Sequence, residues 1–121
     1  MVEISLVRQA AEDFLSLDHS VQLEVRKAFE KLKVDPRSYG EPLGNKAGID
    51  LFGFLSIRAG KRIRLIYSIE GDDHVIIRVI GRREAFAAHR TAQGRIAFLA
   101  SLTRNELITL QNLLTDKDRS P

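Results

Sequence analysis

The chain has 121 residues, of which 44% are hydrophobic, and a net charge of +3. These values are typical of one globular domain and exclude a chain that is disordered throughout. No apolar run approaches the roughly 18 residues that cross a membrane, and the acidic start is unlike a signal peptide, so we expect a cytoplasmic protein. Because the chain contains no cysteine, disulfides and thiolate metal sites are excluded.

The N-terminal third predicts a strand followed by two helices. Hydrophobic residues alternate over residues 2–8, as in a short strand, and residues 10–17 then indicate a brief helix. The apolar positions of residues 21–33 recur at helical spacing along one face. Asp35-Pro36 ends this second helix, because proline disfavours helical geometry in the residue before it. We expect the two helices to form a hairpin that packs on a sheet.

The middle of the chain predicts a meander of three antiparallel strands. Residues 36–50 contain several glycines and prolines and indicate an irregular connection. Strands are expected over residues 54–59, 62–69 and 75–80, because turn-like glycine segments separate them. The predicted fold class is therefore α+β, with an N-terminal helical hairpin on a twisted antiparallel sheet of about four strands, and C-terminal helices.

Period-two alternation assigns the two faces of this sheet. In the third strand of the meander, Val75, Ile77 and Val79 are expected on the apolar core face. The opposite face of the sheet collects four arginines, namely Arg58, Arg62, Arg64 and Arg78. A solvated sheet face that bears arginines is the simpler interpretation of this pattern.

The C-terminal third predicts more helices. A short helix is expected from Glu84 to about Gln93. Thr103-Arg-Asn-Glu106 has the pattern of a capping box, and Leu107, Leu110 and Leu114 follow it as a helical stripe. We expect residues 1–95 to form the core and residues 96–121 to form a helical extension that packs on the same domain. This extension either completes the core or contributes to association.

The basic residues are concentrated between Arg58 and Arg90, where they are twice as many as the acidic ones. Nearly all of them are arginines, whose planar fork of donors matches phosphate oxygens. His89 follows the Gly-Arg-Arg segment at the end of the last strand, and histidine is well matched to proton transfer near neutral pH. Taken alone, a histidine such as His89 is more often an exposed helix residue than a catalytic one. The three histidines show no metal-ligand spacing, so we expect neither a metal nor a cofactor.

The order of these segments resembles the RelE/ParE superfamily of toxins from bacterial toxin–antitoxin systems. A helix ending in Leu-Lys-x-x-Pro is followed by Gly-x-Pro-Leu, here from Leu32 and from Gly40. An Arg-x-x-Tyr strand starts at Arg64, and a Gly-Arg-Arg-Glu segment from Gly81 precedes a helix that carries His89. The resemblance covers roughly residues 2–95 and implies two N-terminal helices packed on a twisted antiparallel sheet.

The resemblance to the RelE branch also implies an activity, which is ribosome-dependent cleavage of mRNA without a metal. When the site residues of that branch are matched to this sequence position by position, the resemblance implies that Arg64, Arg83 and His89 are catalytic. The two arginines would contact the scissile phosphate, and His89 would act as general acid or base. It further implies that Arg58 orients the substrate, and that Ser56 stands where some members carry a lysine. Further RNA contacts are expected from the remaining basic residues, namely Lys61, Arg62, Arg78 and Arg82. The implied partners are a cognate antitoxin and mRNA on the ribosome.

Two other functions are compatible with the same residues. A ParE-like inhibitor of DNA gyrase would act by binding a protein and would need no catalytic base. An inactive family member would serve as a binding or regulatory module. The pair Arg83 and His89 favours the nuclease, because a protein that only binds has no chemical need for an acid–base group.

Overall fold

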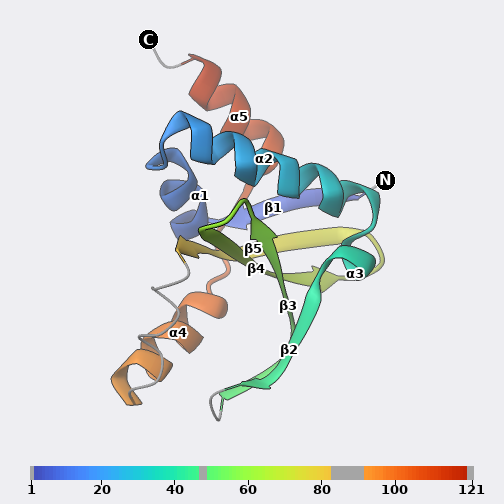
Figure 1. Cartoon of the computed structure of the whole chain (residues 1–121), viewed down its shortest axis with the longest axis vertical. Helices are drawn as coiled ribbons and strands as arrows, with labels where there is room; N and C mark the ends of the chain where they lie inside the picture. The colour runs from blue at the N-terminus through green and yellow to red at the C-terminus, as the bar shows by residue number, and fades with distance from the viewer. Residues whose placement is uncertain (1, 47–48, 83–91, 120–121) are drawn as a thin grey trace.

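The computed structural model describes residues 2–46, 49–82 and 92–119, which form helices on both faces of a six-stranded sheet (Figure 1). The strands are β1 (Glu3–Val7), β2 (Glu41–Lys46), β3 (Ile49–Ala59), β4 (Ile63–Glu70), β5 (His74–Arg82) and β6 (Leu107–Thr109). The helices are α1 (Arg8–Leu15), α2 (His19–Val34), α3 (Pro36–Tyr39), α4 (Ala92–Leu102) and α5 (Leu110–Arg119). No helix in the described ranges is long and apolar enough to cross a membrane.

The α+β class and the β3–β4–β5 meander are confirmed, but the sheet is larger than predicted and is not purely antiparallel. Its strand order is β2-β3-β4-β5-β1-β6, and β1 pairs with β5 in parallel. The prediction of about four strands missed β2 and β6. β2 forms in the segment expected to be irregular, where Gly53 of its partner strand has a φ of +91° that favours glycine.

β6 replaces the start of the predicted C-terminal helix. Residues 107–109 add to the free edge of β1, and the carbonyl oxygen of Glu106 accepts a hydrogen bond from the Arg8 amide. The capping-box prediction at Thr103–Glu106 is therefore wrong. Helix α5 begins at Leu110, where the hydroxyl of Thr109 accepts a hydrogen bond from the Asn112 amide. Pairing with a sheet edge outweighed the local helical preference of this segment.

Two apolar clusters lie on the two faces of the sheet. The larger one joins α1, α2 and α5 to the sheet and contains the fully buried Phe14, Phe29, Leu65 and Tyr67. The smaller one lies under α4 and includes Leu43, Leu51, Ile66 and Leu102. The face that the sequence assigned to arginines is therefore partly covered by α4, because that helix places apolar side chains on it (Figure 1).

A β-bulge in β5 changes the predicted faces of that strand. Ile66 pairs with Val79, whereas the next residue, Tyr67, pairs with Ile77, so Arg78 is the extra residue. Beyond the bulge the alternation is reversed. Val79 consequently packs against the smaller cluster, and Ile80 takes the core position that the sequence assigned to Val79.

Tyr67 connects the sheet to the chain that leads into β2. Its hydroxyl donates a 2.6 Å hydrogen bond to the carbonyl oxygen of Pro36, and its side chain is fully buried. Burial and, to a smaller extent, the negative charge of Asp35 raise the pKa of Tyr67 to about 12. The Asp35 carboxylate caps α3 by accepting hydrogen bonds from the amides of Arg37 and Ser38. Tyr67 of the Arg-x-x-Tyr segment and Pro36 of the Leu-Lys-x-x-Pro segment therefore have a structural role, because they form this hydrogen bond.

We predict that Tyr67 makes the protein sensitive to alkaline conditions. Its phenol ionises near pH 10 in the unfolded chain but only near 12 in the folded one, so stability is full below pH 10 and falls as the pH rises towards 12. The expected loss is about 2 to 3 kcal/mol across this window. Urea denaturation between pH 8 and 12 measures it. Tyr67→Phe should lose this part of the pH dependence, and equal slopes in both proteins would contradict the prediction.

Candidate anion-binding site

Arg58 and Arg64 lie opposite each other on the neighbouring strands β3 and β4. Directly paired residues of an antiparallel sheet project to the same face with their Cβ atoms about 5 Å apart. Arg58 is exposed, whereas Arg64 is half-buried and its Nη1 lies 3.5 Å from the hydroxyl oxygen of Ser56. The sequence prediction that these two arginines share a face is confirmed.

A cavity of about 230 Å³ opens beside this pair, at the edge of β3. Pairing with β2 reaches only as far as Glu41 and Ser56, so the last residues of β3 have no strand partner on that side among the described residues. Chain segments from α2, α3 and β2 surround the opening. The lining residues are Lys31, Tyr39, Glu41, Ser56, Ile57, Arg58 and Arg64.

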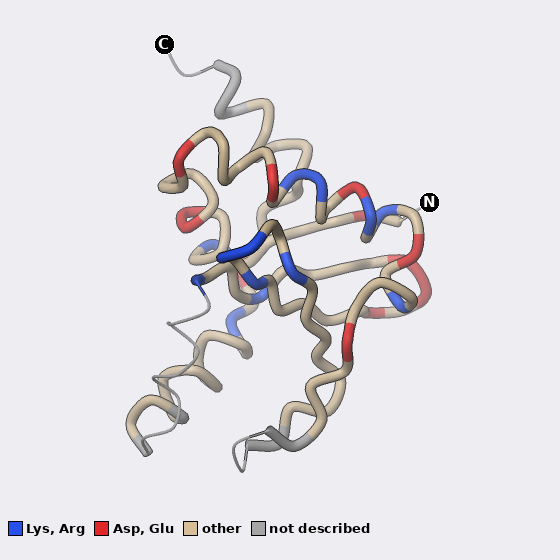
Figure 2. Tube along the Cα trace, viewed as in Figure 1, with Lys and Arg blue, Asp and Glu red and all other residues tan. Residues whose placement is uncertain are grey.

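Positive charge dominates this cavity, because three cationic side chains face one carboxylate. Lys31, Arg58 and Glu41 form no ion pair with any described residue. The ammonium of Lys31 lies 6.0 Å from the centre of the Tyr39 ring, at the outer limit of a cation–π contact. Figure 2 shows the basic residues gathered along the β3–β4 hairpin below α2. The cavity is therefore suited to a phosphate group.

Three other predicted RNA contacts gather around a different cavity. Lys61 and Arg62 lie in the β3–β4 turn, and Arg82 is near them because it pairs with Ile63. All three line a cavity of about 730 Å³ that also contains the acidic residues Asp18 and Glu24. The structure thus divides the predicted phosphate contacts into two groups, and the second group has acidic neighbours.

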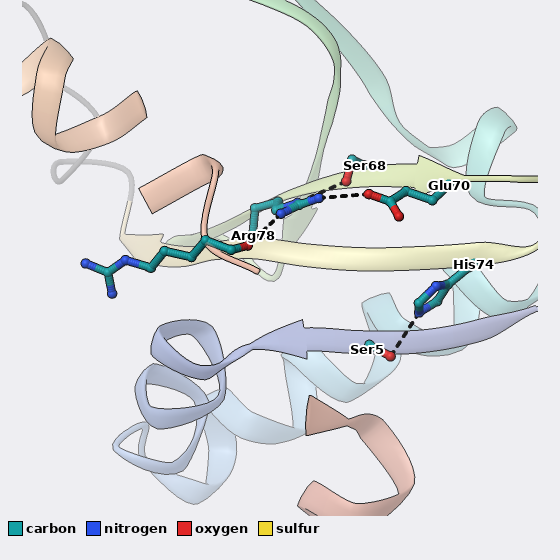
Figure 3. Close-up of polar contacts among 6 residues, drawn as sticks. Ser5, Ser68, Glu70, His74 and Arg78 are labelled. Carbon is teal, nitrogen blue, oxygen red and sulfur yellow. Dashed lines mark hydrogen bonds and ion pairs between the residues drawn. The ribbon is translucent and has the colours of Figure 1, made fainter. Parts of the chain in front are cut away.

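Arg78 is held by three partners inside the protein (Figure 3). Its side chain is only 9% exposed. The guanidinium donates hydrogen bonds to the hydroxyl of Ser68 at 3.0 Å, to the carboxylate of Glu70 at 3.2 Å and to the carbonyl oxygen of Arg104 at 2.8 Å. Because these contacts engage the guanidinium, Arg78 attaches the segment after α4 to the sheet, and we leave it out of the proposed RNA contacts.

Arg83 and His89 lie outside the described residues. Of the three residues predicted to be catalytic, the structure therefore places Arg64 alone. Sequence reasoning missed three polar residues of the cavity, namely Lys31, Tyr39 and Glu41. Lys31 belongs to the polar face of α2, and the other two lie within the segment 36–50 that was expected to be irregular. No local pattern in the sequence indicates that these residues approach Arg58.

Sequence comparison shows which family the chain resembles. Residues 4–86, more than half of the chain, match the family model of the ParE toxin of the type II toxin–antitoxin system parDE. The chain belongs to this toxin family. No curated protein sequence matches it significantly. As a type II toxin, the protein has a cognate antitoxin as its partner, and the predicted RelE/ParE superfamily is confirmed. The match ends before α4, β6 and α5.

Proposed function

We propose that this toxin is a ribosome-dependent mRNA endoribonuclease that inhibits translation. One observation carries the proposal, which is the pairing of Arg58 with Arg64 across two strands beside an open, positively charged cavity. Two guanidinium groups on one face can hold the oxygens of a single phosphate and stabilise the charge that develops on it. RNA supplies such a phosphate together with an adjacent 2′-hydroxyl.

The proposed reaction uses the 2′-hydroxyl as the nucleophile and needs no metal. The 2′ oxygen forms a bond to phosphorus and the bond to the 5′ oxygen breaks. In this scheme Arg64 and Arg83 bind the scissile phosphate, Arg58 orients it, and His89 transfers a proton. Lys61, Arg62 and Arg82 would contact the RNA further along its backbone. The antitoxin would neutralise the toxin by covering this basic surface.

The test is cleavage of mRNA on ribosomes by purified toxin. Arg64→Ala should lower the cleavage rate by about 100-fold, because removing one donor to a developing oxyanion costs this much or more. Arg26→Ala is the matched control, since Arg26 is an exposed arginine of α2 that does not line either cavity. Equal rates for wild type and Arg64→Ala would refute the role of Arg64.

A second candidate function is inhibition of DNA gyrase, which the match to the ParE toxin family favours. Such a toxin acts by binding a protein, so it would leave mRNA intact and would inhibit supercoiling by gyrase in vitro. Wild-type toxin is therefore assayed in both reactions. Gyrase inhibition without mRNA cleavage would replace the nuclease proposal, and the absence of both activities would indicate an inactive member that only binds.

A further inference from the structure

The cavity beside Arg58 and Arg64 also carries an aromatic ring, which the binding of a phosphate does not require. Tyr39 is the last residue of α3 and lines the cavity together with the two arginines and Lys31. It is 48% exposed, and its hydroxyl forms no hydrogen bond with any described residue. The ring therefore offers a flat apolar surface to a ligand, directly beside a group of cationic side chains.

The backbone on both sides of Tyr39 is held in place. Before it, the carboxylate of Asp35 accepts hydrogen bonds from the amide of Ser38 and, at 2.6 Å, from its hydroxyl. After it, Gly40 passes closely against the buried ring of Tyr67. Because both neighbours are fixed, a ligand that packs on the Tyr39 ring orders little of the protein and loses little affinity to that cost.

Lys31 covers the ring only loosely. Its ammonium lies 6.0 Å from the centre of the Tyr39 ring, where a cation–π contact is weak. The Lys31 side chain is exposed and flexible, so a phosphate in the cavity can attract the ammonium away from the ring. Binding of an anion therefore makes the ring more accessible to the part of the ligand that is not charged.

The size of the cavity decides which part of a nucleotide lies on the ring. At about 230 Å³ the cavity is smaller than the usual site of a small organic ligand, so it suits a phosphate with its sugar and leaves the attached base at the rim. Tyr39 supplies the aromatic surface there. Only an unpaired base can place its face on this ring, because the bases of a duplex are stacked on one another.

We propose that Tyr39 is a stacking platform for one unpaired nucleobase, next to the phosphate that Arg58 and Arg64 hold. The inference rests on the RNA substrate of the proposed function and restricts it to single-stranded RNA. Stacking on an aromatic side chain tolerates any base, because every base has a π face. The arginines thus supply the part of the affinity that depends on salt, and Tyr39 supplies a part that does not.

Binding of a short single-stranded RNA to purified toxin, measured by fluorescence anisotropy over a range of salt concentrations, tests this division. Tyr39→Ala should weaken binding by about 10-fold or more at every salt concentration, with an unchanged salt slope, because it removes stacking but no charge. Arg58→Ala should instead reduce the slope of log K against log salt by about 0.7. Tyr39→Phe should bind like wild type, and Tyr39→Leu should bind like Tyr39→Ala. Phe52→Ala is the control, because Phe52 is a more exposed aromatic residue outside this cavity.

A second probe shows whether the ring contacts a base. The same sugar–phosphate backbone without bases should bind wild type about as weakly as the RNA binds Tyr39→Ala. It should lose nothing further in Tyr39→Ala, because the stacking partner is already missing. An equal loss of affinity for both probes would place the backbone on Tyr39 and overturn the inference, as would unchanged RNA binding by Tyr39→Ala.

Cleavage assays on ribosomes separate this inference from the proposed function. Tyr39→Ala should raise KM and leave kcat nearly unchanged, because stacking holds substrate and transition state alike. If wild-type toxin cleaves mRNA and Tyr39→Ala cleaves with the same KM, the base site is wrong and the nuclease proposal stands. If wild-type toxin binds single-stranded RNA through Tyr39 without cleaving mRNA, the base site stands and the nuclease proposal fails.

Discussion

Replacing Gly40 with alanine is expected to destabilise the protein by about 3 to 5 kcal/mol, since it combines steric overlap with the loss of a buried hydrogen bond. A Cβ atom at this position would lie 1.7 Å from the hydroxyl oxygen of Tyr67 and 3.1 Å from the Cβ of Leu55. Gly40 has an ordinary φ of −94°, so the cost arises from this close approach alone. Tyr67 would have to move away from the carbonyl of Pro36, and neither side of the contact is flexible.

Urea denaturation of Gly40→Ala and of the double variant with Tyr67→Phe measures this effect. Removing the hydroxyl relieves the shortest overlap, so Gly40→Ala should cost less in the Tyr67→Phe background than in wild type. The ring carbon that carries the hydroxyl would still lie 2.7 Å from the new Cβ, so the relief is partial. Additive effects of the two changes would show that the contact does not exist.

The consequence of this contact extends to the candidate site. Gly40 lies between Tyr39 and Glu41, both of which line the cavity beside Arg58. The missing side chain at Gly40 lets the backbone pass close to Tyr67, and the chain then enters β2 with Glu41 opposite Ser56. A folded fraction of Gly40→Ala should therefore lose the proposed RNA cleavage as well as stability.

Replacing Arg78 with alanine is expected to destabilise the protein by about 3 kcal/mol, because it removes three hydrogen bonds of a buried cation. Ser68 is also buried and would lose its donor. Glu70 is 60% exposed and can turn to water, which limits the cost on that side. The carbonyl of Arg104 would be released, so the segment before β6 should exchange its amide protons faster.

Arg58→Ala is the matched comparison for this prediction. Arg58 is exposed and has no partner among the described residues, so its replacement should change the free energy of unfolding by less than about 0.5 kcal/mol. It should instead weaken the proposed RNA cleavage. Arg78→Lys should remain destabilised, because an ammonium cannot reproduce the planar arrangement of three bonds. A stable Arg78→Ala protein with reduced RNA binding would restore the role that the sequence assigned to Arg78.

The elements predicted best are those whose signal is repeated along the chain. Helix α2 shows an apolar stripe over four turns, and β3, β4 and β5 alternate with period two between turn residues. Local geometry and burial agree in these segments, so neighbours in sequence carry enough information. The opposition of Arg58 and Arg64 follows from the same alternation and from a tight turn at Gly60.

The elements that were missed depend on partners far away in the sequence. The three residues of β6 are extended because β1 presents a free edge to them, and β1 is parallel to β5 because the helices and the meander lie between the two strands. The bulge at Arg78 reverses the faces of β5, and one extra residue in a regular alternation has no local signature.

The sequence by itself determined the α+β class, the meander, the toxin superfamily and the arginine pair Arg58 and Arg64. All of these arise from periodicity or from the order of short motifs along the chain. Only the tertiary structure decided which basic residues share a cavity, because burial and pairing depend on the whole sheet. The tertiary structure buries Arg78 in the interior and places Glu41 and Lys31 in the cavity beside the arginine pair. The charge of a residue can be read from the sequence, but its neighbours are set by the packed chain.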